Sequence, residues 1–314
     1  MRMFDMSNDS SSFHGSEAEG LAPLYEGKML QAYDHRAASI VLHSENINRD
    51  AQPEITTDEQ HRNPLYKCSP RYWVSCEEID QRLAEWTNSW FVCFKDVAST
   101  TNERTCIFTV LPRVGVGHTV PAVLFKDRGA IEACCFLANF NSLVLDYIAR
   151  QKLGGLHLTY SLLRQLPVLP PSVFTDADRE FIASRVLRLV YTSHDMAPFA
   201  KNVGFKGEPF EWQDSVRKSL ISELDAFYAH LYGLSRRELA YILDPQAVFG
   251  SGFPGETFRT LKERDLEKHG HYRTGQLVLE SFDKLAESPR FRDEMSKRQS
   301  VFDGVRTSES VTAS

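Results

Sequence analysis

Three short apolar runs alternate with polar stretches between residues 90 and 125. The runs, at 90–94, 105–111 and 120–125, are rich in β-branched and aromatic side chains. Runs of this length and composition favour strands, and the polar or glycine-containing stretches between them favour exposed loops. This part of the chain is therefore predicted to form a strand-rich platform with polar loops.

A different spacing of apolar residues begins at Ile131 and continues to Ile148. The apolar positions recur three or four residues apart, on one face of a helix, and Gly154 and Gly155 follow as terminators. The pattern predicts one long buried helix of about five turns. The next segment, LPVLPP at 166–171, can continue neither a helix nor a central strand and is predicted to be an extended connector.

The pattern becomes helical after the prolines. Thr175 with Asp178, and Ser235 with Glu238, have the spacing of capping boxes, in which the first residue caps a helix and the acid three positions later caps it in return. Apolar residues at helical spacing follow each box, so a helix is predicted after each. Further helices are expected over 216–231, ended by Gly233, and on both sides of Gly270.

These elements predict an α+β fold, with a strand-rich domain that contains a long buried helix and a helical subdomain after it. Both ends of the chain are polar and lack a sustained apolar period. The predicted organisation is a flexible or remnant N-terminus at 1–20, a mixed α and β domain at 21–171, a helical subdomain at 172–296 and a disordered tail at 297–314.

Composition narrows the class of protein. The 314 residues include 36 Lys and Arg against 42 Asp and Glu, a net charge of −6, with 42% hydrophobic residues, which suits a globular protein with a sizeable core. No apolar stretch is long enough to span a membrane, and the first residues are too polar for a secretory signal. We therefore expect a cytoplasmic protein without a membrane partner. Its six cysteines form no C-x-x-C pair and are expected to be reduced, mostly structural thiols.

The acidic total argues against indiscriminate binding of nucleic acid, because that binding depends on Lys and Arg neutralising phosphates. The charge is unevenly distributed, however. Residues 90–170 contain eight basic and five acidic side chains, so this window is +3 and the remainder is −9. Within it, the loop STTNERT at 99–105 offers Arg and Asn, the side chains that bind guanine or adenine edges with two hydrogen bonds. A merely solvated loop is the alternative interpretation.

No catalytic set can be identified in the sequence. NPLY at 63–66 differs at Leu65 from the Asn-Pro-Pro-aromatic motif of amino-group DNA methyltransferases, and Asn-Pro predicts a turn there. RVGVGH at 113–118 is followed by a strand-like run instead of the helix that a phosphate site needs, which favours a hairpin. The histidines have no metal-ligand spacing, and G-x-S-x-G is absent. We predict no catalytic residue and no metal site.

Several phrases, taken in order over roughly residues 21–287, resemble one family. They are PLYEGKM (23–29), DHR (34–36), PRYWV (70–74), STTNERT (99–105), VLPRVGVGH (110–118), LANFNSLVLDYIARQKLGG (137–155), QLPVLPP (165–171), LDAFYAHLYGLSRREL (224–239), YILD (241–244) and FRTLKERDLEKHGHYRTGQLVLESFDKL (258–285). Together they resemble the C-terminal part of large adenine-specific (N6) DNA methyltransferases, the type IIG restriction-modification class and relatives associated with phage defence.

The resemblance implies a target-recognition region that has been separated from its catalytic domain. In this family the S-adenosylmethionine loop and the Asn-Pro-Pro-Tyr motif precede the PLYEGKM phrase, whereas NPLY follows it here, so NPLY is a coincidence. The chain is then expected to have no activity alone and no cofactor of its own, since S-adenosylmethionine would bind the missing domain. The implied partners are double-stranded DNA and a separate methyltransferase or restriction subunit.

The strand-rich platform and the resemblance together suggest where DNA would bind. Residues of the 99–105 loop are expected at base edges, and basic residues near the glycine pair are expected at phosphates. An internal ion pair of Arg104 with Glu103 or Asp146 is the alternative for that side chain. The predicted DNA-binding residues are Asn102, Arg104, Thr105, Arg113, Arg150, Lys152 and His157.

Two other hypotheses remain open from the sequence. The chain could be a protein-interaction specificity subunit, whose apolar helical faces around Phe227 and Leu279 bind a separately encoded methyltransferase. It could also be a truncated, non-functional remnant that folds poorly. An independent methyltransferase is disfavoured, because no cofactor loop is found.

Overall fold

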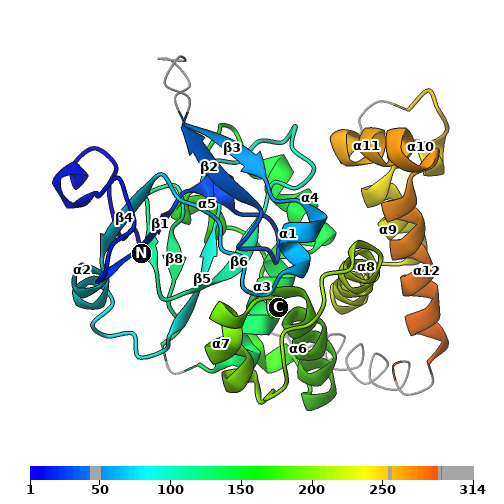
Figure 1. Cartoon of the computed structure of the whole chain (residues 1–314). Coiled ribbons are helices and arrows are strands. Elements are labelled where there is room, and N and C mark those ends of the chain that lie inside the picture. The colour runs from blue at the N-terminus through cyan, green and yellow to red at the C-terminus, as the bar shows by residue number, and fades with distance from the viewer. Residues whose placement is uncertain (43–50, 127, 254–256, 289–290, 292–314) are drawn as a thin grey trace, which may run out of the picture. The chain divides into compact units, whose positions relative to one another are not determined.

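Short strands form three small sheets in this computed structural model, which describes residues 1–42, 51–126, 128–253, 257–288 and 291 (Figure 1). The most deeply buried sheet is antiparallel and has the order β6-β5-β8. Its strands are β5 (Trp90–Phe94), β6 (Phe108–Pro112) and β8 (Ala122–Val123). All five residues of β5 are buried, so the apolar run in the sequence is explained by a central strand covered on both faces.

The other two sheets are formed by strands from the first 116 residues. One has the order β4-β1-β7 and the other pairs β2 with β3. Their strands are β1 (Leu21–Tyr25), β2 (Ala38–Leu42), β3 (Ala51–Ile55), β4 (Tyr72–Ser75) and β7 (Gly115–Val116). The hairpin prediction at 113–118 is wrong, because β7 pairs in parallel with β1. A Cβ on Gly115 would lie 2.5 Å from Cγ2 of Val74, so close packing within the sheet requires the glycine.

The long buried helix predicted over 131–148 is two helices instead of one. α3 (Ala130–Asn141) and α4 (Leu143–Lys152) meet at an angle of 58°. Ser142 lies between them in an extended conformation, with φ −68° and ψ 143°, and its hydroxyl accepts the backbone N–H of Leu145 as the N-cap of α4. Asn141 contributes to the break, because its side-chain amide pairs with both the N–H and the C=O of Phe108, each at 2.9 Å.

The first residues of the chain are folded, contrary to the prediction of a flexible or remnant N-terminus. Met3 and Phe4 are only 3% and 1% exposed, and the backbone N–H of Phe4 donates to the carbonyl of Val116 at 3.1 Å. The guanidinium of Arg82 lies 4.1 Å from the centre of the Phe4 ring. The apolar residues of this segment, Met1, Met3, Phe4 and Met6, form no sustained period, which explains why the sequence did not reveal this packing.

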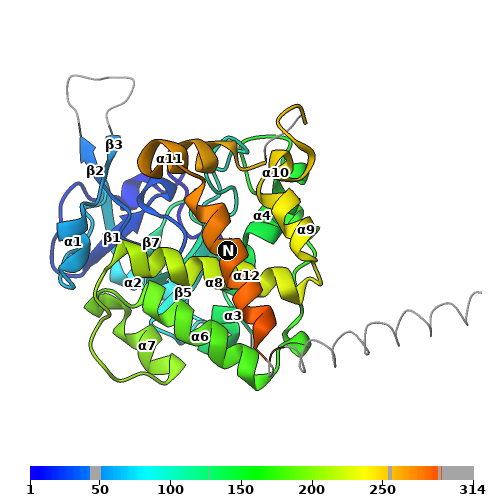
Figure 2. The same ribbon diagram turned by 90° about the vertical axis from the view of Figure 1, so that its right-hand side faces the viewer.

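Helices cover the β6-β5-β8 sheet, and α3 is in contact with β6 (Figures 1 and 2). α6 (Asp176–Val190) and α7 (Ala197–Val203) pack against α3, and α6 begins with the predicted Thr175–Asp178 capping box. The contacts of the chain divide it into Met1–Leu220 and Ile221–Ser314. The division therefore falls within α8 (Asp214–Leu231) and not after the proline run, because α6 completes the core of the first unit.

The second unit is helical. It contains α9 (Arg236–Leu243), α10 (Pro245–Phe249), α11 (Arg259–His269) and α12 (Arg273–Glu287), and α12 contacts both α9 and α11 (Figure 2). The Ser235–Glu238 capping box and the C-cap at Gly270, where φ is +74°, confirm the predicted helix ends. Phe227 is 2% exposed and packs on Tyr228 and Phe291, so this face of α8 is part of the core.

The remaining helices are short. They are α1 (Asp58–Arg62), α2 (Cys76–Arg82), α5 (Tyr160–Leu163) and the 3-10 helices η1 (Ser10–Ser12), η2 (Gly27–Met29), η3 (Pro171–Val173) and η4 (His194–Met196). All six cysteines are free, and only Cys76 is exposed. None of the described helices is by itself long and apolar enough to cross a membrane; the bent pair α3 and α4, taken together, meets that criterion by length and composition only. The predicted tail at 297–314 lies outside the described residues.

The buried N-terminal segment leads to a test of stability. Replacing Phe4 with Ala should lower the free energy of unfolding by about 3–5 kcal/mol, because a fully buried aromatic side chain is lost and a cavity remains. Leu65→Ala is the matched control, since Leu65 is 73% exposed, and should change stability by less than about 0.5 kcal/mol. Chemical denaturation of both variants measures the difference. Equal stabilities would mean that the segment does not pack as described.

Candidate nucleic-acid interface

A polar loop, defined here as residues 99–105, joins the segment after β5 to the segment before β6. The hydroxyl of Ser99 accepts the backbone N–H of Thr101, and the Ser99 carbonyl accepts the N–H of Asn102 and the hydroxyl of Thr105. Thr101 and Asn102 are exposed, whereas Thr105 is fully buried. The loop therefore folds around Ser99 and presents Thr101 and Asn102 to solvent.

Arg150 of α4 holds the polar loop from beneath. Its guanidinium donates to the carbonyls of Thr100 at 2.7 Å, Asn102 at 2.8 Å and Glu103 at 2.9 Å. Arg150 is 7% exposed, so its charge is directed into the protein. Three carbonyls in fixed positions restrict the backbone on both sides of Asn102. The phosphate contact predicted for Arg150 stays untested, but this geometry favours a positioning role.

Asp146 completes the support of the polar loop. Its carboxylate lies 3.3 Å from Nη2 of Arg150, one turn away on α4, and accepts the backbone N–H groups of Thr105 at 2.9 Å and Cys106 at 3.0 Å. Asp146 is fully buried. Burial raises the pKa of its carboxyl group above the usual range, and the charges of Arg150 and Arg104 only partly offset this effect. Asp146 and Arg150 together are called the loop clasp below.

Arg104 also points inward. One Nη of its guanidinium donates to the carbonyl of Asn141 at 2.5 Å, at the C-terminal end of α3, where the helix dipole favours a positive charge. Thr105, likewise predicted to contact bases, is fully buried, and its hydroxyl donates to the carbonyl of Ser99. Of the three loop residues predicted at base edges, the structure therefore leaves Asn102 as the exposed one.

Arg113 lies away from the polar loop, beyond the opposite end of β6. Its guanidinium binds the carboxylate of Asp80 at 2.6 Å and the carbonyl of Trp86 at 2.7 Å, and makes a longer contact with the carbonyl of Leu83. These contacts join α2 to the start of β5. The structure therefore does not place Arg113 with the other predicted DNA-binding residues.

Lys152 and His157 are both exposed. His157 forms an antiparallel bridge with Val97, just before the loop, and two backbone hydrogen bonds of 2.8–2.9 Å join the flanking residues. Nδ1 of His157 lies 3.5 Å from the buried carboxylate of Asp96. The structure therefore pairs the segment after α4 with the residues that lead into the polar loop.

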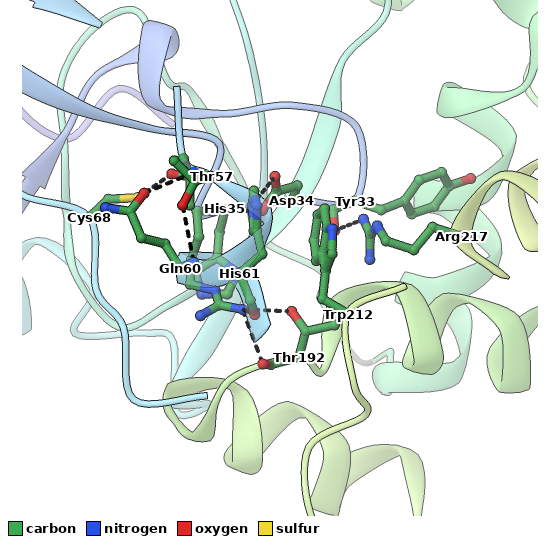
Figure 3. A network of polar contacts seen from close by, with 12 residues as sticks. Tyr33, Asp34, His35, Thr57, Gln60, His61, Cys68, Thr192, Trp212 and Arg217 are labelled. Carbon is green, nitrogen blue, oxygen red and sulfur yellow. Dashed lines mark hydrogen bonds and ion pairs between the residues drawn. The ribbon is translucent and has the colours of Figure 1, made fainter. Parts of the chain in front are cut away.

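A second polar network is buried around the DHR phrase (Figure 3). Arg36 is completely buried and donates to the carbonyls of His61, Asn63, Tyr66 and Thr192 at 2.9–3.2 Å. The Asn63 and Tyr66 carbonyls belong to the NPLY segment. This segment forms the predicted turn, in which the N–H of Tyr66 donates to the carbonyl of Asn63. Arg36 thus binds an irregular segment to the end of α6.

Two histidines extend this network. His61 contacts Asp34 at 3.1 Å and stacks on Trp212 at 3.7 Å, with the guanidinium of Arg217 3.6 Å from the centre of the Trp212 ring (Figure 3). Burial lowers the pKa of Arg217 to about 10, so it stays charged near neutral pH. Tyr33 has a φ of +61°, which is strained for a bulky residue, and Arg217 donates to its carbonyl.

His35 contacts the carboxylate of Asp195 at 3.1 Å, and the hydroxyl of Ser193 donates to the same carboxylate. Burial by itself would raise the pKa of Asp195, but the attraction and hydrogen bond of His35, with help from Ser193 and Arg36, hold it well below its usual range. Serine, histidine and aspartate meet here, yet the serine proton is directed to the aspartate and His35 is 1% exposed. This arrangement stabilises the fold and does not present a nucleophile.

The sequence missed the loop clasp. Asp146 and Arg150 are four residues apart, which places them on one helix face, and that spacing was the available signal. No group of three or more His, Cys, Asp or Glu side chains in the described part of the chain is arranged to hold a metal ion. In comparisons with protein families, curated proteins and solved structures, this chain matched none.

Removing one partner of the loop clasp should destabilise the fold. We expect Arg150→Met to lower the free energy of unfolding by about 3–5 kcal/mol, because Asp146 keeps a buried charge without its partner. It should also speed amide hydrogen exchange in residues 99–105. Lys152→Met, two positions away on the exposed end of α4, is the matched control and should change neither quantity. Unchanged exchange in Arg150→Met would contradict the clasp.

The low pKa of Asp195 predicts a loss of stability in acid. The unfolded carboxyl group takes up its proton near its ordinary pKa of 3.8, whereas the folded one stays ionised to lower pH, so stability falls as the pH drops from about 5 to 3. Asp195→Asn should flatten this dependence and lower stability at pH 7. Asp176→Asn, at an exposed position, is the control. Thermal unfolding at several pH values measures both; parallel pH profiles for wild type and Asp195→Asn would refute the prediction.

Proposed function

We propose that this chain is a DNA sequence-recognition module, which binds duplex DNA through the polar loop and works with a separate methyltransferase or restriction subunit. The observation that carries the proposal is the loop clasp. It fixes the backbone at residues 100, 102, 103, 105 and 106 from the inside, while Thr101 and Asn102 remain exposed. A buried charge pair used to hold a polar surface loop suits a loop that must keep its shape for binding.

Fixed geometry matters for reading DNA sequence. An asparagine side chain recognises adenine by two simultaneous hydrogen bonds to N6 and N7, which requires an accurate position of its amide. A loop already ordered in the free protein loses less conformational entropy on binding. The exposed Asn102, held on each side by Arg150, is therefore our candidate for a base contact.

Phosphate contacts would come from basic side chains elsewhere in the window from residue 90 to 170. The exposed ones are Lys126, Arg128, Lys152 and Arg164. Their small number agrees with the net negative charge of the chain. The logarithm of the binding constant should therefore fall with the logarithm of the salt concentration with a slope no steeper than about −4.

The resemblance to adenine-specific (N6) DNA methyltransferases gives the proposal its biological context. In that context the chain selects the DNA sequence in a restriction-modification or phage-defence system, and the separate subunit supplies S-adenosylmethionine and the catalytic residues. The absence of a recognisable catalytic set in the sequence agrees with this division. A preference of Asn102 for adenine-containing sites would agree with a partner subunit that methylates adenine.

Selection from a random duplex library, followed by fluorescence anisotropy at low salt, tests the proposal. Wild type should enrich a sequence motif and bind it at least about tenfold more tightly than unrelated duplex. Asn102→Ala should reduce that preference by about five- to a hundredfold, since one base contact is lost. Asn8→Ala, at an exposed asparagine outside the loop, is the matched control.

Two results of this experiment would count against the proposal or part of it. Binding no stronger than that of an acidic control protein, with and without a methyltransferase partner, would overturn the proposal. Binding with an unchanged preference in Asn102→Ala would move the base contact away from this side chain.

A further inference from the structure

A pocket of about 200 Å³ lies in the first unit, between α3, the 166–171 connector and the first turns of α6. Most of its lining is apolar, and three of the lining residues are phenylalanines from separate segments, namely Phe125, Phe136 and Phe174. Spaces larger than a water molecule are few in well-packed proteins, and an apolar one gives water few hydrogen-bond partners. This space, called the apolar pocket below, therefore suits an apolar group of another molecule better than solvent.

Contacts within the protein hold the walls of the apolar pocket in place. The backbone N–H of Leu169, in the connector, donates at 3.0 Å to the side chain of Asn139, which lies on α3 and is 1% exposed. Two prolines follow Leu169, and their rings fix the backbone φ angles. The rings of Phe125 and Phe136 meet edge to face, with their centres 5.0 Å apart. A pocket that is already formed reduces the conformational entropy lost when a ligand binds.

Three charged side chains also line the apolar pocket, Arg128, Glu132 and Arg179. Glu132 is in the first turn of α3, where the positive end of the helix dipole stabilises a carboxylate. The guanidinium of Arg179 donates to the carbonyl of Pro171 at 2.9 Å and to the exposed carboxylate of Asp176 at 3.3 Å. Arg128 is exposed and makes no hydrogen bond or ion pair with another described residue. Two guanidinium groups against one carboxylate leave a net positive charge among the lining residues.

These properties select the chemical class of the ligand. An apolar cavity of about 150 Å³ is enough to hold a benzene ring, whereas pockets for drug-sized molecules measure about 300–1,000 Å³. The apolar pocket therefore has room for a single ring with a short substituent. Aromatic walls favour an aromatic ring, because ring edges and faces attract one another. Guanidinium groups bind carboxylates by paired, charge-assisted hydrogen bonds, so a carboxylate is the substituent that suits them.

Cys135 belongs to the wall of the apolar pocket and supplies no reactive group. It is 4% exposed, and burial raises the pKa of its thiol to about 12, although the charge of Arg179 acts in the opposite direction. The thiol therefore stays protonated near neutral pH, whereas the thiolate is the nucleophilic form. A ligand in this pocket is held by non-covalent contacts.

We propose that the apolar pocket binds a small aromatic monocarboxylate, with its ring against the three phenylalanines and its carboxylate on Arg128 and Arg179. This site does not depend on the proposed function, because neither the polar loop nor the loop clasp contributes to its lining. Arg128, counted above among the exposed basic residues of the window, then has a carboxylate as its partner.

An NMR chemical-shift titration of the full chain with phenylacetate and its neutral amide tests the site near neutral pH. The acid should bind with a Kd of about 0.1–1 mM, as expected for a ligand of this size, and at least about tenfold more tightly than the amide. Arg128→Gln should weaken binding of the acid about tenfold and leave binding of the amide unchanged. Arg62→Gln, at an exposed arginine outside the pocket, is the matched control and should bind both compounds as wild type does.

A second variant fills the apolar pocket. Val168→Trp adds a large ring among the lining residues and should abolish binding of both compounds, whereas Leu65→Trp, at a position that is 73% exposed, should bind them as wild type does. Thermal unfolding shows whether each variant is folded. If Val168→Trp does not fold, the comparison of acid and amide in Arg128→Gln decides, because an exposed side chain without a partner can be replaced without loss of stability.

Three results would overturn the proposal. They are the failure of phenylacetate to bind wild type, equal affinities of wild type for the acid and the amide, and unchanged binding by a folded Val168→Trp variant. Each concerns the apolar pocket alone, so DNA binding by the same preparation would leave the proposed function standing.

Discussion

The buried pair of Asp146 and Arg150 is the constraint on which the rest of the candidate interface depends. Two charges that are 0% and 7% exposed are costly to bury unless every polar atom finds a partner. They find them in one another and in the backbone of residues 100–106. The pair therefore requires the polar loop to adopt one shape, and the polar loop in turn satisfies the pair.

The same principle recurs around Arg36. There, too, a buried guanidinium is surrounded by backbone carbonyls from segments without regular structure, and its contacts reach from the NPLY turn to Thr192 at the end of α6. Arginine suits this role because its planar group has five donors in fixed directions and stays charged when buried. Small sheets leave many loops outside regular hydrogen bonding, and buried arginines supply the missing donors in this unit.

Two kinds of segment meet at the candidate interface. The backbone of the polar loop is hydrogen-bonded to Asp146 and Arg150 beneath it, whereas a Cβ on Gly154 or Gly155 would meet nothing within 4 Å. Under the proposed function, an ordered polar loop matters because base contacts require accurate placement. The seven residues suggested by the sequence fall into three groups in the fold. Arg104, Thr105 and Arg150 build the loop, Arg113 braces α2, and Asn102, Lys152 and His157 are exposed.

The sequence by itself determined the local elements: the α+β class, the strand at 90–94, the capping boxes before α6 and α9, and the stop at Gly270. These depend on side-chain types at short spacings, which can be read directly from the sequence. The break at Ser142, the buried Phe4 and the inward direction of Arg150 were decided only by tertiary structure. Each depends on a partner distant in sequence, namely Phe108, Val116 and the 99–105 loop. A polar residue looks the same in sequence whether it faces DNA or a buried carbonyl, because burial alone makes the distinction.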